Sequence, residues 1–349
     1  MQKISDLIGP TWQKLLHSPV RWLIFLLAGA AVVGFPLLSF PQSAFWVRVV
    51  AYTGLYIILG LGLNVQVGFT GQLDLGYVAF YAIGAYTYGL LASPQFDLHL
   101  SFWLMLPVAA LAAGLAGVLL CIPVLRMRGD YLAIVTLGFG EIVRILLTNL
   151  KGLTNGSQGL VDIDPPGVFG HGVGTGVHFY YLILILLAGT IILVNRLNNS
   201  RTGRAWTALR DDEDVAQMAG INTTSAKLLS FGLGAMIAGV AGAVFAAWQS
   251  SIFPDNFNLL VSINVLCLVI IGGVGSVPGV ILGSAALITL PDILRKFADY
   301  RLLIFGLLLI VMMIARPNGF IPARRPALEG QNRLDRRGSP AGKTERAER

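Results

Sequence analysis

The sequence from residue 195 to residue 227 reads NRLNNSRTGRAWTALRDDEDVAQMAGINTTSAK, and it is the only long interior block that is polar and charged. Apolar segments flank it on both sides, so this block is where the chain can meet a water-soluble partner. Asp211 is a natural N-cap residue, and the three acidic residues after it place negative charge on a first helical turn, where the helix dipole favours it. Gly220 is typical of the C′ position that ends a helix. We therefore expect a short capped helix here, and the alternative is a solvated connector.

The composition of the whole chain indicates a membrane protein. Of its 349 residues, 55% are hydrophobic and only 12% are charged, and the mean hydropathy is +0.72. A soluble domain carries roughly a quarter charged residues. The first apolar run has no small-residue cleavage site after it, so we interpret it as a retained helix and not as a removed signal peptide. The fold class that we expect is an all-α polytopic membrane protein.

Membrane spans are predicted from charge-poor apolar runs of about twenty residues. Ten such runs occur, at 22–40, 49–69, 75–92, 102–125, 131–150, 179–194, 228–248, 259–272, 280–294 and 302–315. The runs 259–272 and 302–315 are short, so each either forms a re-entrant half-helix or extends into flanking polar residues. About ten transmembrane helices are therefore expected, with eight as the alternative. The abundant glycines beside these runs predict close helix packing or broken helices that line a cavity.

Basic residues are distributed unevenly along the chain. Nineteen of the 25 lysines and arginines lie before residue 22, at Arg126 and Arg128, between 196 and 227, or after residue 315. The positive-inside rule then places both termini and the 195–227 loop in the cytoplasm and the 151–178 segment in the periplasm. We expect a cytoplasmic N-terminal segment at 1–21, a transmembrane domain at 22–322 and a disordered basic cytoplasmic tail at 323–349. Topology accounts for the net charge of +7, so no nucleic-acid partner is expected.

Several chemical functions find no support in the sequence. Residues 338–344 read GSPAGKT, one residue too short for a phosphate-binding P-loop, and no strand precedes them. The four histidines show no His-Glu-x-x-His spacing, and both cysteines lie in apolar runs, so no metal site is expected. The chain is thus predicted to be no enzyme and to bind no cofactor itself. Any ATP would be bound by a partner.

Polar residues inside the apolar runs are informative because they are costly there. Glu141 and Arg144 are three residues apart on one helix face, and Asp74 follows a glycine-containing break at 68–71. One interpretation is that the pair stabilises helix packing and that Asp74 caps the helix that restarts after the break. The other is that a polar translocation path is lined by Asn64, Gln66, Gln72, Asp74, Glu141 and Arg144.

Several stretches resemble those of one transporter family. Residues 214–220 (DVAQMAG) resemble the Glu-Ala-Ala-x-x-x-Gly motif in the cytoplasmic coupling loop of ATP-binding-cassette (ABC) importers, with Asp for Glu and Val for the first Ala. Further matching stretches are 61–64, 68–71, 76–86, 203–213, 272–276, 316–319 and above all PVLRMRGDYLAIVTLGFGEIVR at 123–144. Together they resemble the branched-chain amino-acid ABC permeases of bacteria, of the LivM type, over residues 50–322. The basic tail departs from this pattern.

The resemblance implies a permease subunit that imports branched-chain or related hydrophobic amino acids across the inner membrane. It further implies a homologous second permease of the LivH type, two ABC ATPase subunits that bind ATP and Mg inside, and a periplasmic amino-acid-binding protein outside. Ala216 would be the small-residue contact of the coupling helix, to which we assign Arg204, Asp211, Asp212, Glu213, Asp214, Ala216 and Gly220. The alternatives are a urea or short-amide permease of the same fold and a stand-alone ion-coupled secondary amino-acid transporter.

Overall fold

The computed structural model describes residues 34–37, 43–93, 100–125, 127, 129–168, 171–172, 176–293, 306–307, 310, 314 and 319–321, which we call the described part of the chain. The expected N-terminal segment 1–21 and the tail 323–349 lie outside it. So do most residues of the expected spans 22–40 and 302–315.

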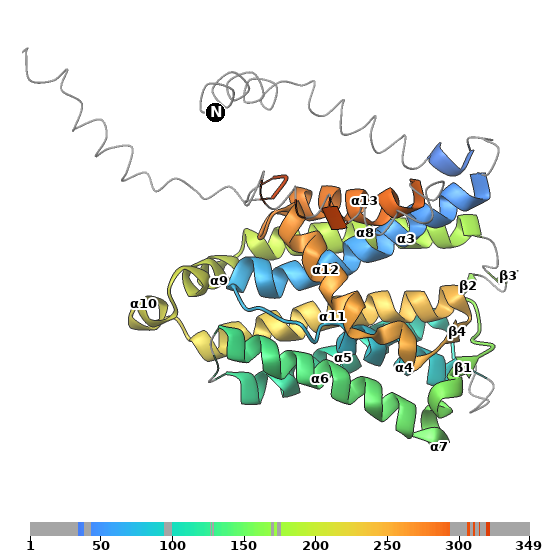
Figure 1. Cartoon of the computed structure of the whole chain (residues 1–349), viewed down its shortest axis with the longest axis horizontal. Helices are drawn as coiled ribbons and strands as arrows, with labels where there is room; N and C mark the ends of the chain where they lie inside the picture. The colour runs from blue at the N-terminus through green and yellow to red at the C-terminus, as the bar shows by residue number, and fades with distance from the viewer. Residues whose placement is uncertain are drawn as a thin grey trace, which may run out of the picture.

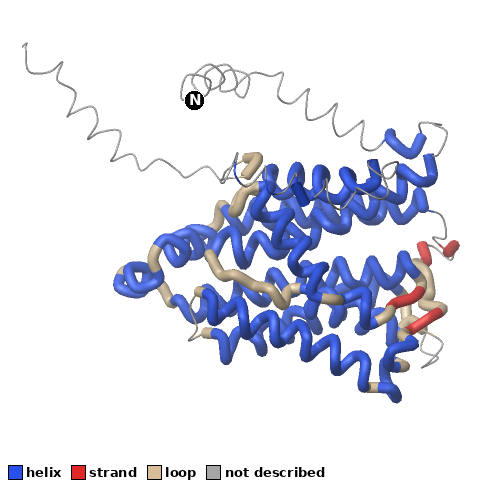
Figure 2. The backbone as a smooth tube through the Cα atoms, viewed as in Figure 1, coloured by secondary structure: helices blue, strands red, loops and turns tan. Residues whose placement is uncertain are grey.

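Helices make up most of the described part (Figure 2). The α-helices are α3 (Ser43–Leu63), α4 (Val78–Leu91), α5 (Phe102–Val124), α6 (Asp130–Asn149), α7 (Lys151–Thr154), α8 (Gly176–Asn198), α9 (Arg201–Asp211), α10 (Glu213–Met218), α11 (Thr223–Gln249), α12 (Leu259–Gly272) and α13 (Val277–Ile293). The 3-10 helices are η1 (Phe35–Leu37), η3 (Gly156–Gln158) and η4 (Pro254–Phe257), and η2 (Asn64–Phe69) is a π-helix.

Two short antiparallel strand pairs lie at one end of the helices. Strand β1 (Leu160–Val161) pairs with β4 (Ser251–Ile252), with Leu160 opposite Ile252. Strand β2 (Gly167–Val168) pairs with β3 (His171–Gly172). Helix α7 lies at this end as well, whereas α9 and α10 project from the opposite end (Figure 1). The polar loop 195–227 and the strands are therefore separated by the length of the long helices.

Six helices of the described part are long and apolar enough to cross a membrane. They cover Ala44–Phe69, Phe102–Val124, Asp130–Asn149, Gly176–Asn198, Thr223–Gln249 and Pro254–Gly272. Each overlaps one of the expected spans, and α12 has the expected limits. Helices α4 and α13 are apolar but shorter, with 14 and 17 residues. The expectation of a polytopic helical membrane protein is confirmed.

Helix α11 lies at the centre and packs most extensively against α5 and α4. Its contact with α4 is made through backbone atoms, because Gly84 faces Gly239 so closely that a Cβ at Gly84 would collide with the Gly239 backbone. Small residues let membrane helices approach in this way. The upper half of Figure 1 is formed by α3, α8 and α13, with α11 below them. Close packing, one of the two expected uses of glycine, is therefore present at this contact.

Helix α3 continues into the π-helix η2 and then loses its helical form. A π-helix bonds residue i to residue i+5, and such segments are frequent at functional sites. After Thr70 the chain runs without regular helix or strand structure to Tyr77, and α4 follows. The helix therefore ends within the expected break at 68–71, and the π-helix before it was not expected.

Candidate functional site

The polar loop 195–227 contains two helices, not one. Ser200 precedes α9, and its Oγ accepts a hydrogen bond from the backbone N of Gly203 at 3.2 Å. Asp212 precedes α10, and its Oδ1 accepts from the backbone N of Asp214 at 2.9 Å and of Val215 at 3.0 Å. The predicted N-cap at Asp211 is therefore wrong by one residue, because Asp211 is the last residue of α9 and only Asp212 has the extended backbone of a cap.

The C-terminal end of α10 follows the prediction. Gly220 has a φ of +83°, the left-handed conformation that glycine adopts without strain. Its backbone N donates to the carbonyl of Gln217 at 3.0 Å, and the backbone N of Ile221 donates to the carbonyl of Ala216 at 3.1 Å. These two bonds form a Schellman motif, so Gly220 ends the helix as a C′ residue.

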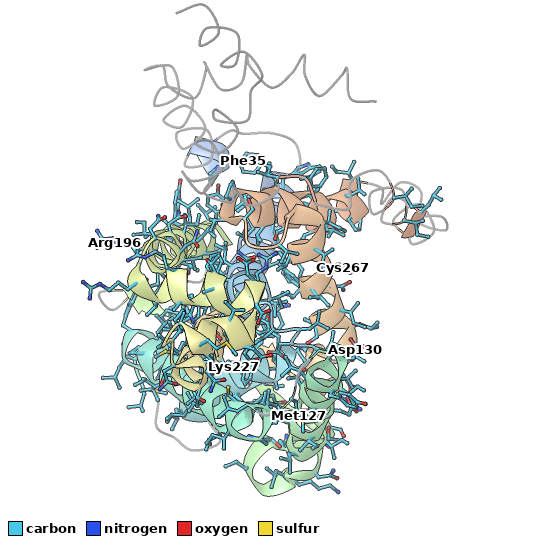
Figure 3. All side chains as sticks on the ribbon, turned by 90° about the vertical axis from the view of Figure 1, so that its left-hand side faces the viewer. Phe35, Met127, Asp130, Arg196, Lys227 and Cys267 are labelled. Carbon is cyan, nitrogen blue, oxygen red and sulfur yellow. The ribbon has the colours of Figure 1, made fainter. Side chains whose placement is uncertain are left out.

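Helix α10 is fastened to the first turns of α11 by a buried ion pair. The Nζ of Lys227 lies 2.6 Å from Oε1 of Glu213, with side-chain exposures of 7% and 22%. The same Nζ donates to the carbonyl of Leu125, just after α5, at 3.4 Å. In Figure 3, which faces this end of the molecule, Lys227 lies near the centre of the view between the yellow helices of the loop and the green ones. A movement of α10 would therefore act on α11.

Helix α9 is fastened to the π-helix η2. Arg210 donates through Nη1 to the carbonyl of Gly68 at 2.6 Å, and the ring of Trp206 stacks on Phe69 with 6.3 Å between ring centroids. Trp206 also donates through Nε1 to the carbonyl of Ala226 at 2.9 Å. Sequence reasoning missed these contacts, although a signal was present. Gly203, Trp206 and Leu209 recur every third residue and form the buried face of α9.

The side chains that α10 exposes to solvent are not the ones that the sequence predicted. Ala216, expected to be the small-residue contact for a partner, is only 2% exposed and packs against its own chain. Val215 and Met218 are instead exposed, Met218 by 88%. Asp214 is exposed too, and so is Arg204 on α9. The surface that α9 and α10 offer to solvent is thus an apolar pair beside acidic and basic groups, and the Ala216 interpretation is replaced.

A group of buried polar side chains surrounds η2 and the irregular segment after it. Asn64 accepts through Oδ1 from the backbone N of Gly275 at 2.8 Å, and Gln66 donates through Nε2 to the carbonyl of Phe231 at 3.3 Å. One polar atom in each of four side chains finds no hydrogen-bond partner in the described part; these are in Asn64, Gln66, Gln72 and Asp74. Because a buried polar atom without a partner is costly, this stretch is chemically distinct from ordinary helix packing.

Asp74 does not cap the helix that follows it. Its Oδ1 accepts a hydrogen bond from the backbone N of Gly76 at 2.8 Å, which closes a turn. Tyr77 precedes α4, and no side chain caps that helix. The predicted cap is therefore wrong, because the chain stays irregular for three residues between Asp74 and Val78. The backbone N of Leu75 meets Thr136 Oγ1 on α6 at 3.0 Å, so the turn packs on α6.

Glu141 and Arg144 form the predicted pair, but away from the four buried side chains. Arg144 donates through Nε to Oε1 of Glu141 at 3.0 Å, and its Nη1 lies 3.4 Å from Oδ1 of Asp255 in η4. The side chains of Arg144 and Glu141 are 31% and 41% exposed. The expected polar residues therefore divide into two groups, one buried around η2 and one on the outer face of α6.

Comparison with known proteins assigns the family. A family model described as the permease component of the branched-chain amino acid transport system matches residues 45–315. The high-affinity branched-chain amino acid transport system permease protein LivM of Salmonella typhimurium is 43% identical over 336 residues, 89% of this chain and 78% of that protein. LivM of Escherichia coli is 42% identical over 90% of this chain and 78% of its own length.

A second type of permease is similar at a lower level. The permease protein LivH of Salmonella typhimurium is 24% identical over 300 residues, 78% of this chain and 92% of that protein. No solved structure matches the chain. The resemblance seen in the sequence is confirmed, and the chain belongs to the family of permease components of branched-chain amino acid transport systems.

Proposed function

We propose that the chain is a membrane-spanning permease subunit of a binding-protein-dependent ABC importer for branched-chain amino acids. The observation that carries this proposal is the 43% identity to a LivM permease along nearly the whole chain. The matched residues include the loop with α9 and α10 and the polar stretch around η2. The partners are a homologous LivH-type permease, two ABC ATPase subunits that hold ATP and Mg, and a periplasmic amino-acid-binding protein.

The tip of α10 would dock into the ATPase. An exposed apolar pair, Val215 and Met218, fits a groove on a soluble partner, and the adjacent Asp214 suits basic groups there. Movement of the ATPases would reach the membrane by two routes, through the Glu213–Lys227 ion pair to α11 and through Arg210 to η2. If the loop were only a solvated connector, neither the Glu213–Lys227 ion pair nor the Arg210–Gly68 hydrogen bond would have a role in transport.

The buried polar stretch would belong to the translocation path. Asn64, Gln66, Gln72 and Asp74 keep unpaired polar atoms at the point where η2 ends and the chain becomes irregular. Transporters place such interrupted helices where substrate passes, since irregular backbone in a membrane is tolerated when it lines a cavity. The anchor from Arg210 to Gly68 would then join the ATPase side directly to this stretch.

The topology that we propose has ten spans in the bacterial inner membrane, with α4 and α13 among them and both termini in the cytoplasm. Its test is labelling of single cysteines on a background that lacks Cys121 and Cys267. Gln217→Cys in α10 is expected to react with a membrane-impermeant maleimide only from the cytoplasmic side. Ser157→Cys in η3, at the opposite end, is expected to react only from the periplasmic side. Reversed accessibility of the pair would contradict the orientation.

Transport by purified components tests the function itself. The chain would be co-expressed with the second permease and the ATPases of its system and reconstituted in liposomes with the binding protein. We expect uptake of leucine, isoleucine or valine that requires both ATP and the binding protein. Uptake of urea alone would favour the short-amide permease of the same fold. Uptake by this chain alone without ATP would favour a stand-alone secondary transporter.

A further inference from the structure

The outer face of α6 combines exposed apolar side chains with the Glu141–Arg144 ion pair. Ile134, Ile142 and Ile145 are exposed on this helix, and the ion pair lies among them, half-buried. Glu141 is eleven residues from the start of α6 at Asp130. At about 1.5 Å per residue this places it roughly 16 Å along the helix axis. The apolar core of a bilayer is about 30 Å thick, so a 20-residue helix that crosses it holds the pair within that core.

Lipid is an unfavourable neighbour for such a face. Charged side chains at mid-membrane are costly, and they almost always face protein or water. The exposed face of α8 carries no such charges near mid-helix. Its exposed large apolar side chains include Ile185, Ile192 and Leu193. The two helices are both largely exposed in this chain, yet only the outer face of α6 carries charges.

Two further features of the α6 face suit another protein helix. Gly138 lies one turn before the ion pair, and a Cβ added there would meet nothing within 4 Å. A glycine on an open helix face lets a second helix approach closely. Asp255 lies beside Arg144 with 91% of its side chain exposed, and it gives the three charged groups an excess of one negative charge. A partner that presents a cation or hydrogen-bond donors would balance that charge.

We infer that this face of α6, comprising Ile134, Gly138, Glu141, Ile142, Arg144 and Ile145, is the surface on which the second, homologous permease subunit docks. The inference rests on the proposed function, which supplies that subunit. Salmonella typhimurium has permeases named LivM and LivH, and both are similar to this chain. A partner of related sequence can present its own equivalent of α6, so that the two helices meet about a pseudo-two-fold axis. The Glu141–Arg144 pair is then enclosed by protein instead of lipid.

Photo-crosslinking in the assembled transporter tests this inference. Benzoylphenylalanine would replace Ile142 on α6 or Ile185 on α8, which are exposed isoleucines in the middle of two long helices. The complex would be expressed with the second permease carrying its own tag, irradiated in native membranes and examined by mass spectrometry. We expect the probe at position 142 to form an adduct with the second permease and the probe at position 185 to form none. Ile134 provides a second probe on α6 if the variant at 142 does not assemble.

The outcomes separate the two proposals. If the second permease co-purifies but its adduct forms from position 185 and from neither α6 position, the inference about α6 is wrong while the proposed function stands. An α6 adduct with lipid, with a second copy of this chain or with this chain itself also overturns the inference. Failure of any second permease to co-purify with the unmodified chain contradicts both.

Discussion

Lys227→Met is expected to destabilise the folded protein strongly, and removal of the partner charge in the same chain is expected to restore much of the loss. Lys227 is buried, and its ammonium group lies 2.6 Å from Glu213. Methionine preserves the apolar part of the side chain but leaves the Glu213 carboxylate without that cation. Removing one member of a buried pair costs about 3–5 kcal/mol, and the partial exposure of Glu213 reduces this to roughly 2 kcal/mol.

Thermal unfolding of the detergent-solubilised protein measures this effect. The set comprises Lys227→Met, Glu213→Gln and the double variant, with Lys151→Met on the exposed surface of α7 as the matched control. We expect the control to unfold like the unmodified chain and Lys227→Met to unfold at a clearly lower temperature. The double variant is expected between them, because it removes both charges of the pair. A double variant as unstable as the sum of its single variants would show that the two charges do not act as a pair.

Gly220→Val is expected to uncouple ATP hydrolysis from transport while the membrane domain stays folded. The φ of +83° at Gly220 is unfavourable for any residue with a Cβ and especially for a β-branched one. An added Cβ meets nothing within 4 Å at this position, so the cost of the first side-chain atom comes from the backbone conformation. A strain of about 1–2 kcal/mol per left-handed residue would lower the population of the native α10 ending roughly tenfold.

The measurement is ATPase activity of the reconstituted complex with and without loaded binding protein, beside substrate uptake. The matched control is Gly189→Val in the middle of α8, where an added Cβ likewise meets nothing within 4 Å but φ is not positive. We expect stimulation and uptake to fall together in Gly220→Val and to be retained in Gly189→Val. Undiminished uptake in Gly220→Val would mean that the loop is a solvated connector.

The sequence predicted the long helices well because apolar runs are a strong signal at membrane length. The polar loop and Gly220 were also located correctly, because a run of charged residues and a glycine that ends a helix are both local signals in the sequence. The N-cap was misplaced because Asp211 and Asp212 have the same side chain. Which of them caps α10 depends on where α9 ends, and α9 is held by the packing of Trp206 on Phe69 and by the bond from Arg210 to Gly68.

The π-helix and the two groups of polar residues could not be predicted from local signals. Asn64 lies in an apolar run that favours a regular helix, and the contact to Gly275 N joins residues that are 211 positions apart. Likewise, the spacing of Glu141 and Arg144 predicted that they pair, which is correct, but their third partner is Asp255 in η4. Spacing along one helix contains no information about such distant neighbours.

The backbone contact between α4 and α11 limits how a harmful mutation could be repaired. A side chain at Gly84 would strike the backbone of Gly239, which every amino acid possesses. No second-site substitution can remove that obstacle, so suppressors of Gly84→Ala should be absent from α11. Gly114 on α5 differs, because its added Cβ would approach the side chain of Met236, with Cγ at 2.5 Å. A smaller residue at position 236 can compensate there, so position 114 can change together with α11 during evolution, whereas position 84 cannot.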